Sequence, residues 1–131
     1  MRVIKLIRIM FEGKSIECDA LFDSGASVTV ISTRFFEKNF GRKWQILQKP
    51  IKIFWINGSL IEVSKFVQIF IQVDNLIFPE TVFLIDEFVE KIIVNEKEIK
   101  IPQVIIGAGT MDKYGIILDP KEDIKTSAIM L

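Results

Sequence analysis

Residues 20–31 of this 131-residue chain read Ala-Leu-Phe-Asp-Ser-Gly-Ala-Ser-Val-Thr-Val-Ile, and this is the most informative stretch of the sequence. It places a carboxylate, Asp23, in a tight turn between two apolar runs. Gly25 allows the turn without a Cβ clash, so neighbouring amides can point at the Asp23 carboxylate, and Ser24 adds a hydroxyl beside it. The triplet also suits an ordinary Asx turn, and it arises by chance in about one chain of this length in twenty.

Composition describes a single well-cored domain spanning residues 1–131. Half of the residues are hydrophobic (50%) and 26% are charged, which excludes intrinsic disorder. The 17 Lys and Arg balance the 17 Asp and Glu, so the chain lacks the positive surplus with which proteins bind nucleic acid or anionic membranes. Histidine is absent, which removes Ser/His/Asp and Cys/His catalysis and most zinc sites.

The single cysteine, the N-terminal residues and the spacing of the other acids indicate a cytoplasmic protein without a cofactor. The single cysteine, Cys18, cannot form an intramolecular disulfide and is expected to be a buried structural residue. The first ten residues interrupt apolar side chains with charges, so they predict neither a signal peptide nor a membrane span. The other acids lie in mixed-charge clusters without metal-ligand spacing, so no metal is expected.

Apolar and polar residues alternate along most of the chain, which predicts a mainly β protein. A first short helix is expected from the cap at Ser32-Thr33 to Phe40, ending at Gly41, and a second around 110–114. Residues 86–93 also fit a helix, but we favour a hairpin over 92–101 that turns at 95–97. Strands are expected at 2–10, 15–22, 27–31, 51–56, 60–63, 66–73, 76–85, 104–106 and 116–118.

The whole string from Ala20 to Ile31 resembles the active-site signature of the retropepsin-like (retroviral-type) aspartic proteases. The family also carries an apolar-apolar-Gly segment beneath its catalytic loop, followed by a short helix. Here Ile105, Ile106 and Gly107 stand in that order before the second expected helix. The resemblance implies a retropepsin-like acid protease β-barrel with one or two short helices, forming one half of a two-fold symmetric dimer.

That resemblance implies an aspartic endopeptidase acting on extended peptide or unfolded protein. The chemistry needs two carboxylates, one as general base on water and one as proton donor, and this chain carries one such motif. We therefore expect a homodimer in which Asp23 from each subunit meets at the two-fold axis. Two carboxylates about 3 Å apart share one proton, which predicts an acidic to weakly acidic optimum. By resemblance, Ser24 links the two catalytic loops, Gly25 donates its amide to the carboxylate, and Ala26 completes the loop.

The Asn57-Gly58 pair lies between the two halves of the signature, where the family places its mobile flap. Both residues tolerate positive φ, so the pair predicts a type I′ hairpin, with Trp55 and Ile56 facing substrate or the partner flap. An ordinary surface hairpin is the alternative. The family's termini form a dimer sheet, and the N-terminal strand and the apolar tail, residues 127–131, suit that role; pairing within the monomer is the alternative.

Two further readings stay open. The first is a non-catalytic retropepsin-fold module that binds peptides or mediates dimerisation. The intact Asp23-Ser24-Gly25 triplet argues against it, because a pseudo-enzyme has no chemical reason to keep a costly buried carboxylate. The second is an unrelated small β-barrel with a chance Asp-Ser-Gly turn, in which Asp23→Asn would change nothing enzymatic.

Overall fold

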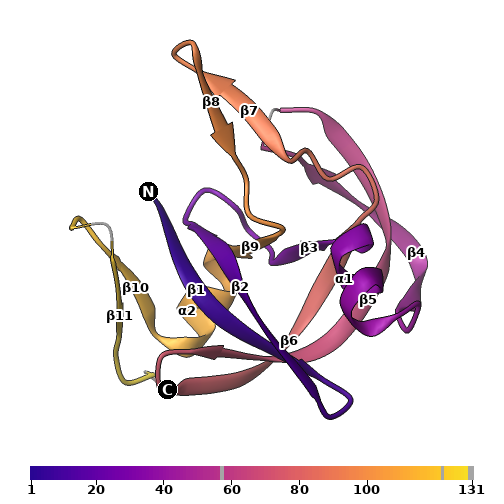
Figure 1. Ribbon diagram of the computed structural model, residues 1–131, viewed down its shortest axis with the longest axis horizontal. Coiled ribbons are helices and arrows are strands. Elements are labelled where there is room, and N and C mark those ends of the chain that lie inside the picture. Colours follow the sequence, from indigo (N-terminus) through magenta and orange to yellow (C-terminus); the bar gives the residue numbers. More distant parts are fainter. Residues whose placement is uncertain (57, 122, 130–131) are drawn as a thin grey trace.

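The computed structural model describes residues 1–56, 58–121 and 123–129. Figure 1 shows a β-rich barrel flanked by short helices. Asn57, Glu122, Met130 and Leu131 lie outside the described residues. The strands are β1 (Arg2–Phe11), β2 (Lys14–Asp23), β3 (Val30–Ser32), β4 (Gln45–Phe54), β5 (Leu60–Val73), β6 (Leu76–Ile85), β7 (Lys91–Val94), β8 (Lys97–Lys100), β9 (Val104–Gly107), β10 (Ile116–Asp119) and β11 (Asp123–Thr126).

Within the described residues, one sheet follows the order β1-β2-β9-β3-β6-β5-β4, and an additional β1–β5 pairing closes six of these strands into a barrel. Because successive side chains of a strand point to opposite faces, one apolar set from each strand fills the interior. Ile9, Phe22, Ile71 and Ile106 are completely buried there. The prediction of a mainly β barrel is therefore confirmed.

The first hairpin aligns the N-terminal residues with the end of the signature strand. β1 and β2 pair antiparallel with Phe11 opposite Lys14, and Glu12 and Gly13 form the turn, both with positive φ. Such a turn suits the right-handed twist of its strands. The register continues without interruption to Arg2, which lies opposite Asp23.

The second half of the chain pairs directly with the signature strand. β9 runs parallel to β2, with Asp23 opposite Gly107, and antiparallel to β3 on its other side. The apolar-apolar-Gly segment is thus central in the sheet, with all four β9 residues buried. This pairing brings the Asp-Ser-Gly turn and the segment expected beneath it together.

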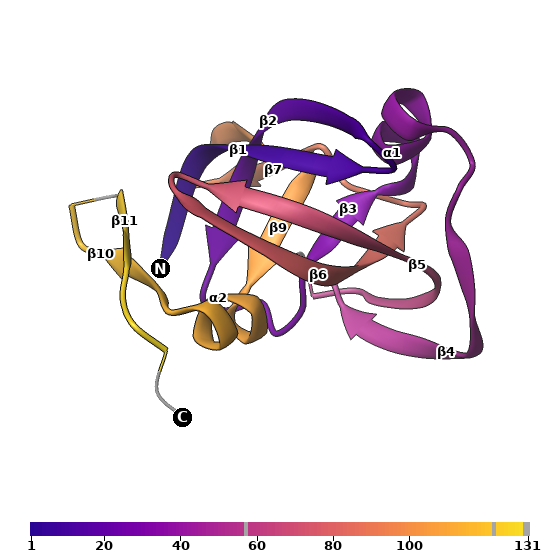
Figure 2. The same ribbon diagram turned by 90° about the horizontal axis from the view of Figure 1, so that it is seen from below.

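Both predicted helices are present, on different sides of the barrel (Figure 2). Helix α1 (Thr33–Phe40) begins where the Ser32 hydroxyl accepts from the Phe35 amide, and it ends at Gly41 as expected. Helix α2 (Ala108–Tyr114) ends at Gly115, whose φ of 68° is left-handed. Neither helix, nor any other in the described part of the chain, has the length and apolar character required to cross a membrane.

Gly41 is expected to matter for stability through its backbone alone. Its φ of 87° and ψ of −177° are open essentially only to glycine, and a Cβ there would meet no atom. We expect Gly41→Ala to lower the free energy of unfolding by about 2 kcal/mol in urea denaturation. Arg34→Ala, an exposed change in the same helix, is the control and should stay within about 0.5 kcal/mol. Equal effects of the two variants would contradict this.

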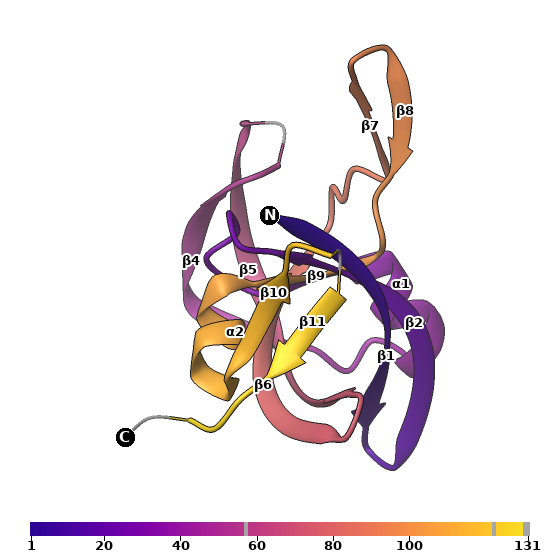
Figure 3. The same cartoon turned by 90° about the vertical axis from the view of Figure 1, so that its left-hand side faces the viewer.

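The hairpin expected over 92–101 is confirmed, and the alternative helix over 86–93 is absent. β7 and β8 pair with Val94 opposite Lys97, and Asn95 and Glu96 both have positive φ. In Figures 1 and 3 this hairpin extends beyond the barrel, on the same side as the loop between β4 and β5.

The strand expected at 27–31 is shorter than predicted, since β3 covers only Val30–Ser32. The preceding residues form a loop because the Ser27 carbonyl and the Thr29 hydroxyl accept hydrogen bonds from the Gly109 and Gly107 amides. These contacts replace the ladder that a strand would need.

The two termini pair within the single chain. β1 is bonded to β2 along its length and to β5 at Arg8–Met10, while β11 pairs with β10. Beyond β11 the Ser127 amide donates to the Gly115 carbonyl, and Ile129 is 55% exposed. The part of the tail at Met130 and Leu131 lies outside the described residues, and its role in a dimer sheet stays a prediction.

Candidate active site

Asp23 ends β2 as a buried carboxylate with polar contacts to both oxygens. It is 6% exposed, and Oδ1 accepts from the Gly25 amide at 2.9 Å, the contact that the resemblance implies. Oδ2 accepts from Arg2 Nε at 3.3 Å. The turn therefore holds the carboxylate in one orientation, and Arg2, whose side chain is half exposed, supplies a positive charge beside it.

Ser24 is exposed next to Asp23, and its contacts within the chain run to Met1. The Ser24 amide donates to the Met1 carbonyl at 3.1 Å, and its hydroxyl lies 3.2 Å from the same oxygen. The hydroxyl also accepts from the Met1 amino group at 2.9 Å. The role that the resemblance gives Ser24, a link between two catalytic loops, would require exchanging these contacts for contacts with a partner.

The loop that follows Asp23, residues 24–29, is the candidate catalytic loop, and it rests on the junction of β9 and α2. Three successive amides bind it: Gly107 donates to the Thr29 hydroxyl at 3.1 Å, Ala108 to the Ala26 carbonyl at 2.6 Å, and Gly109 to the Ser27 carbonyl at 3.1 Å. A Cβ at Gly107 would lie 2.4 Å from the Val28 carbonyl oxygen, so only glycine allows this approach. Ile105 and Ile106 flank this junction within the buried β9 strand.

A cleft of about 560 Å³ opens above Asp23, between the catalytic loop and the end of β4. Among the described lining residues Asp23 is the single acid, and Arg2 and Lys52 are the cations; the rest are apolar or small. Its lining is completed by Gly25, Ala26, Ser27, Val28, Val30, Ile51, Ile53, Phe54, Trp55, Ile56 and Ile105.

The candidate flap residues occupy different environments. Trp55 is 5% exposed and packs edge-on against Phe88 with ring centroids 4.8 Å apart, so it anchors the base of the hairpin as well as lining the cleft. Ile56 is half-buried and lines the cleft, and Gly58 is exposed. Asn57 lies outside the described residues.

The type I′ prediction for this hairpin is wrong in register. The Gly58 amide donates to the Trp55 carbonyl at 2.8 Å, so Gly58 is not a central residue of a two-residue turn. The Trp55 amide donates to the Ser59 carbonyl at 2.7 Å, and Gly58 has a φ of 87°. The hairpin is therefore closed by Trp55 and Ser59, with Gly58 in the left-handed region.

Solved structures identify the architecture. No family model matches the sequence, and no curated protein matches it. A solved structure of the retroviral protease-like domain of Ddi1 from Leishmania major is similar, with a TM-score of 0.63 and 13% sequence identity over 97% of this chain and 90% of that one. The chain has a retropepsin-like fold. At this identity the likeness concerns the fold and not the activity.

Two features of the site in this retropepsin-like fold were not predicted from the sequence. Arg2 could have been found by counting, because a turn at Glu12-Gly13 places residue 2 opposite residue 23. The second feature is the polar contact between Thr29, in the candidate catalytic loop, and Thr110 and Glu80 beneath it; these residues are far apart in sequence, and no local motif links them. No group of three or more candidate metal ligands occurs in the described part of the chain.

Cys18 lies outside the site on β2, and its thiol is expected to be unreactive. Burial, with a smaller contribution from the Asp19 carboxylate, raises the pKa of the thiol to about 12. The thiolate is the reactive form, so at pH 8 alkylation by iodoacetamide should be much slower in the folded protein than in guanidinium chloride. Equal alkylation rates in the two conditions would contradict this.

Proposed function

We propose that this protein is a homodimeric aspartic endopeptidase. The observation that carries the proposal is the buried carboxylate of Asp23, the single acid among the described residues that line the cleft, held by the Gly25 amide in a retropepsin-like fold. One carboxylate cannot serve as general base and general acid at once. A second copy of the chain would supply the missing group.

In the proposed reaction a water molecule between two Asp23 carboxylates attacks the peptide carbonyl. The ionised carboxylate removes a proton from the water, while the protonated one donates to the carbonyl oxygen. The resulting tetrahedral intermediate is never bonded to the enzyme. The carboxyl group that took the proton from water gives it to the amide nitrogen, the other carboxylate removes a hydroxyl proton from the intermediate, and the C–N bond breaks to release the amine and the new carboxyl group. The Gly25 amide keeps the carboxylate oriented while the proton moves.

The lining of the cleft favours apolar peptide segments in extended conformation. Ile53, Ile56 and Ile105 contribute apolar side chains to the lining of the cleft. An extended peptide could add its backbone as a further strand beneath the hairpin, with alternate side chains in pockets. Trp55, Ile56, Asn57 and Gly58 would close over it and exclude water.

Cleavage of an unfolded protein substrate between pH 3 and 7 tests the proposal, measured over at least a hundredfold range of enzyme concentration. A dimeric enzyme should show cleavage that rises faster than linearly while the dimer is partly dissociated. The cross-subunit dyad would be ruled out if activity stayed strictly proportional to enzyme concentration down to the lowest concentration tested, while sedimentation showed the protein to be monomeric there.

A non-catalytic peptide-binding module is the second candidate function. It is favoured because the groups that catalysis would use already have hydrogen-bond partners within one chain: Arg2 binds Asp23, and Met1 binds Ser24. An absence of cleavage at every pH and concentration, together with saturable binding of the unfolded substrate, would select this candidate.

A further inference from the structure

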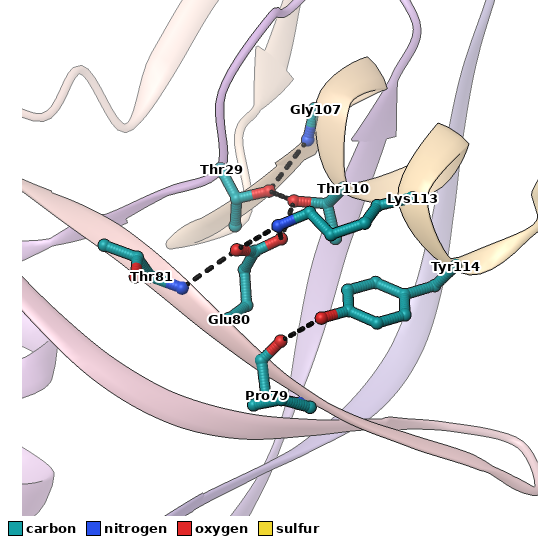
Figure 4. A network of polar contacts seen from close by, with 8 residues as sticks. All are labelled: Thr29, Pro79, Glu80, Thr81, Gly107, Thr110, Lys113 and Tyr114. Carbon is teal, nitrogen blue, oxygen red and sulfur yellow. Dashed lines mark hydrogen bonds and ion pairs between the residues drawn. The ribbon is translucent and has the colours of Figure 1, made fainter.

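Glu80 is a buried carboxylate that does not line the cleft. Figure 4 shows its contacts with Thr81, Thr110 and Lys113. Glu80 is 9% exposed on β6, and burial of an unpaired carboxylate would be costly. Its Oε1 accepts from the Thr81 amide at 2.9 Å and its Oε2 from the Thr110 hydroxyl at 2.7 Å. Lys113 Nζ reaches both oxygens, at 3.0 and 3.2 Å.

The hydrogen bonds that start at Glu80 have a fixed direction. The Thr110 hydroxyl has one proton, and it goes to Glu80, because a carboxylate only accepts. In the 2.6 Å contact between the Thr110 and Thr29 hydroxyls, Thr29 must then be the donor. Thr29 in turn accepts from the Gly107 amide at 3.1 Å. The carboxylate therefore orients a relay that runs from Gly107 through Thr29 and Thr110.

The two members of the relay farthest from Glu80 belong to the site. Thr29 lies in the catalytic loop, and Gly107 lies opposite Asp23 in the parallel β2–β9 pair. The relay is buried at both hydroxyls, so water cannot replace a missing partner. A change at Glu80 must consequently alter the hydrogen bond of Gly107 and the position of the loop that orients Asp23.

We infer that Glu80 is a positioning residue for Asp23: its carboxylate polarises the Thr110–Thr29 relay and thereby fixes Gly107 and the catalytic loop. The inference deepens the proposed function and rests on it for its catalytic meaning. The inference also makes a structural claim, that Glu80 fixes the environment of the Gly107 amide and of the Gly25 amide that binds Asp23. That claim can be tested on these two amides even if the protein shows no activity.

The decisive variants separate this relay from ordinary packing of α2 on β6. Glu80→Gln keeps the size of the side chain but replaces one carboxylate oxygen with an NH2 group, which only donates. That group must point at either the Thr81 amide or the Thr110 hydroxyl, both of which donate to Glu80 in the wild type. Thr29→Val removes the central hydroxyl, and Thr29→Ser restores it. Tyr114→Phe is the matched control, because it deletes the 2.7 Å bond from Tyr114 to the Pro79 carbonyl, between the same two elements, without touching the relay.

The first readout is NMR of the Gly107 and Gly25 amides in the folded variants. In Glu80→Gln and Thr29→Val we expect both amide resonances to move and Gly107 to exchange with solvent at least about tenfold faster. Thr29→Ser and Tyr114→Phe should leave both near their wild-type values. Unchanged amides in Glu80→Gln and Thr29→Val, or equal changes in Tyr114→Phe, would overturn the inference. If Glu80→Gln does not fold, the Thr29 pair decides.

The second readout is kinetic. Thr29→Val should lower kcat by about tenfold to a hundredfold with little change in KM, and Thr29→Ser should recover most of it, because a misplaced carboxylate slows the chemical step. A change in KM alone would overturn the positioning role. If the wild type cleaves nothing, the proposed function fails, while the amide measurements still decide whether Glu80 fixes the loop.

Discussion

Cleavage is expected to fall by at least about a thousandfold when Asp23 is replaced by asparagine, because the amide can neither remove a proton from water nor donate a shared one. The change is nearly isosteric, and the asparagine side-chain oxygen can still accept from the Gly25 amide that now binds Oδ1. The loop should therefore keep its shape. Initial rates on an unfolded substrate at the optimal pH measure the loss.

Asp19→Asn is the matched control, since Asp19 is an exposed acid on the same strand and undergoes the same chemical change. It should leave the rate within about twofold of wild type. Equal cleavage by wild type and Asp23→Asn would leave Asp23 without a catalytic role and would point to a contaminating protease.

Mixtures of the two proteins extend this prediction to the dimer. If subunits exchange freely, an equal mixture contains about one quarter wild-type dimers, so activity should drop to about a quarter and not to half. At nine parts of Asp23→Asn to one of wild type, about one per cent should remain. A loss that follows the wild-type fraction linearly would indicate that each chain acts alone.

Most of the fold could be predicted from the sequence because the patterns that specify strands and turns are local. Alternation along β1, β2, β5 and β6 reports which face of each strand is buried, and glycines at positive φ mark the turns. The loop around Asp23 could be predicted for the same reason, since Asp23, Ser24 and Gly25 are adjacent in sequence.

The parts that were missed depend on contacts between distant segments. Hairpin turns of different lengths use a glycine at positive φ, so Gly58 alone could not set the register of the hairpin. The Arg2–Asp23 ion pair needed the register of a whole hairpin, which the sequence allows but does not display as a motif.

Glu80 did leave a signal in the sequence. Between Phe78 and Leu84, every second residue of β6 is buried: Phe78, Glu80, Val82 and Leu84. An acid at a position that alternation assigns to the interior must find donors there, because burial without them is costly. The sequence thus indicates that Glu80 has partners, but only the fold identifies them as Thr110 and Lys113.

Gly107→Ala is expected to have the largest effect on stability, about 3 kcal/mol or more in the free energy of unfolding. The new Cβ would lie 2.4 Å from the Val28 carbonyl oxygen and 2.8 Å from that of Ala26. These atoms are backbone, so relief requires moving the catalytic loop away from β9. That movement would break the three amide contacts that hold the loop.

Asp112→Ala, an exposed change in α2, is the control and should stay within about 0.5 kcal/mol. Urea denaturation measures both variants. Any Gly107→Ala protein that remains folded should also cleave more slowly, because Gly107 lies opposite Asp23 and the loop can relax only by displacing the carboxylate. Wild-type stability together with wild-type activity in Gly107→Ala would mean that the loop does not rest on β9, and the support assigned to this junction would be wrong.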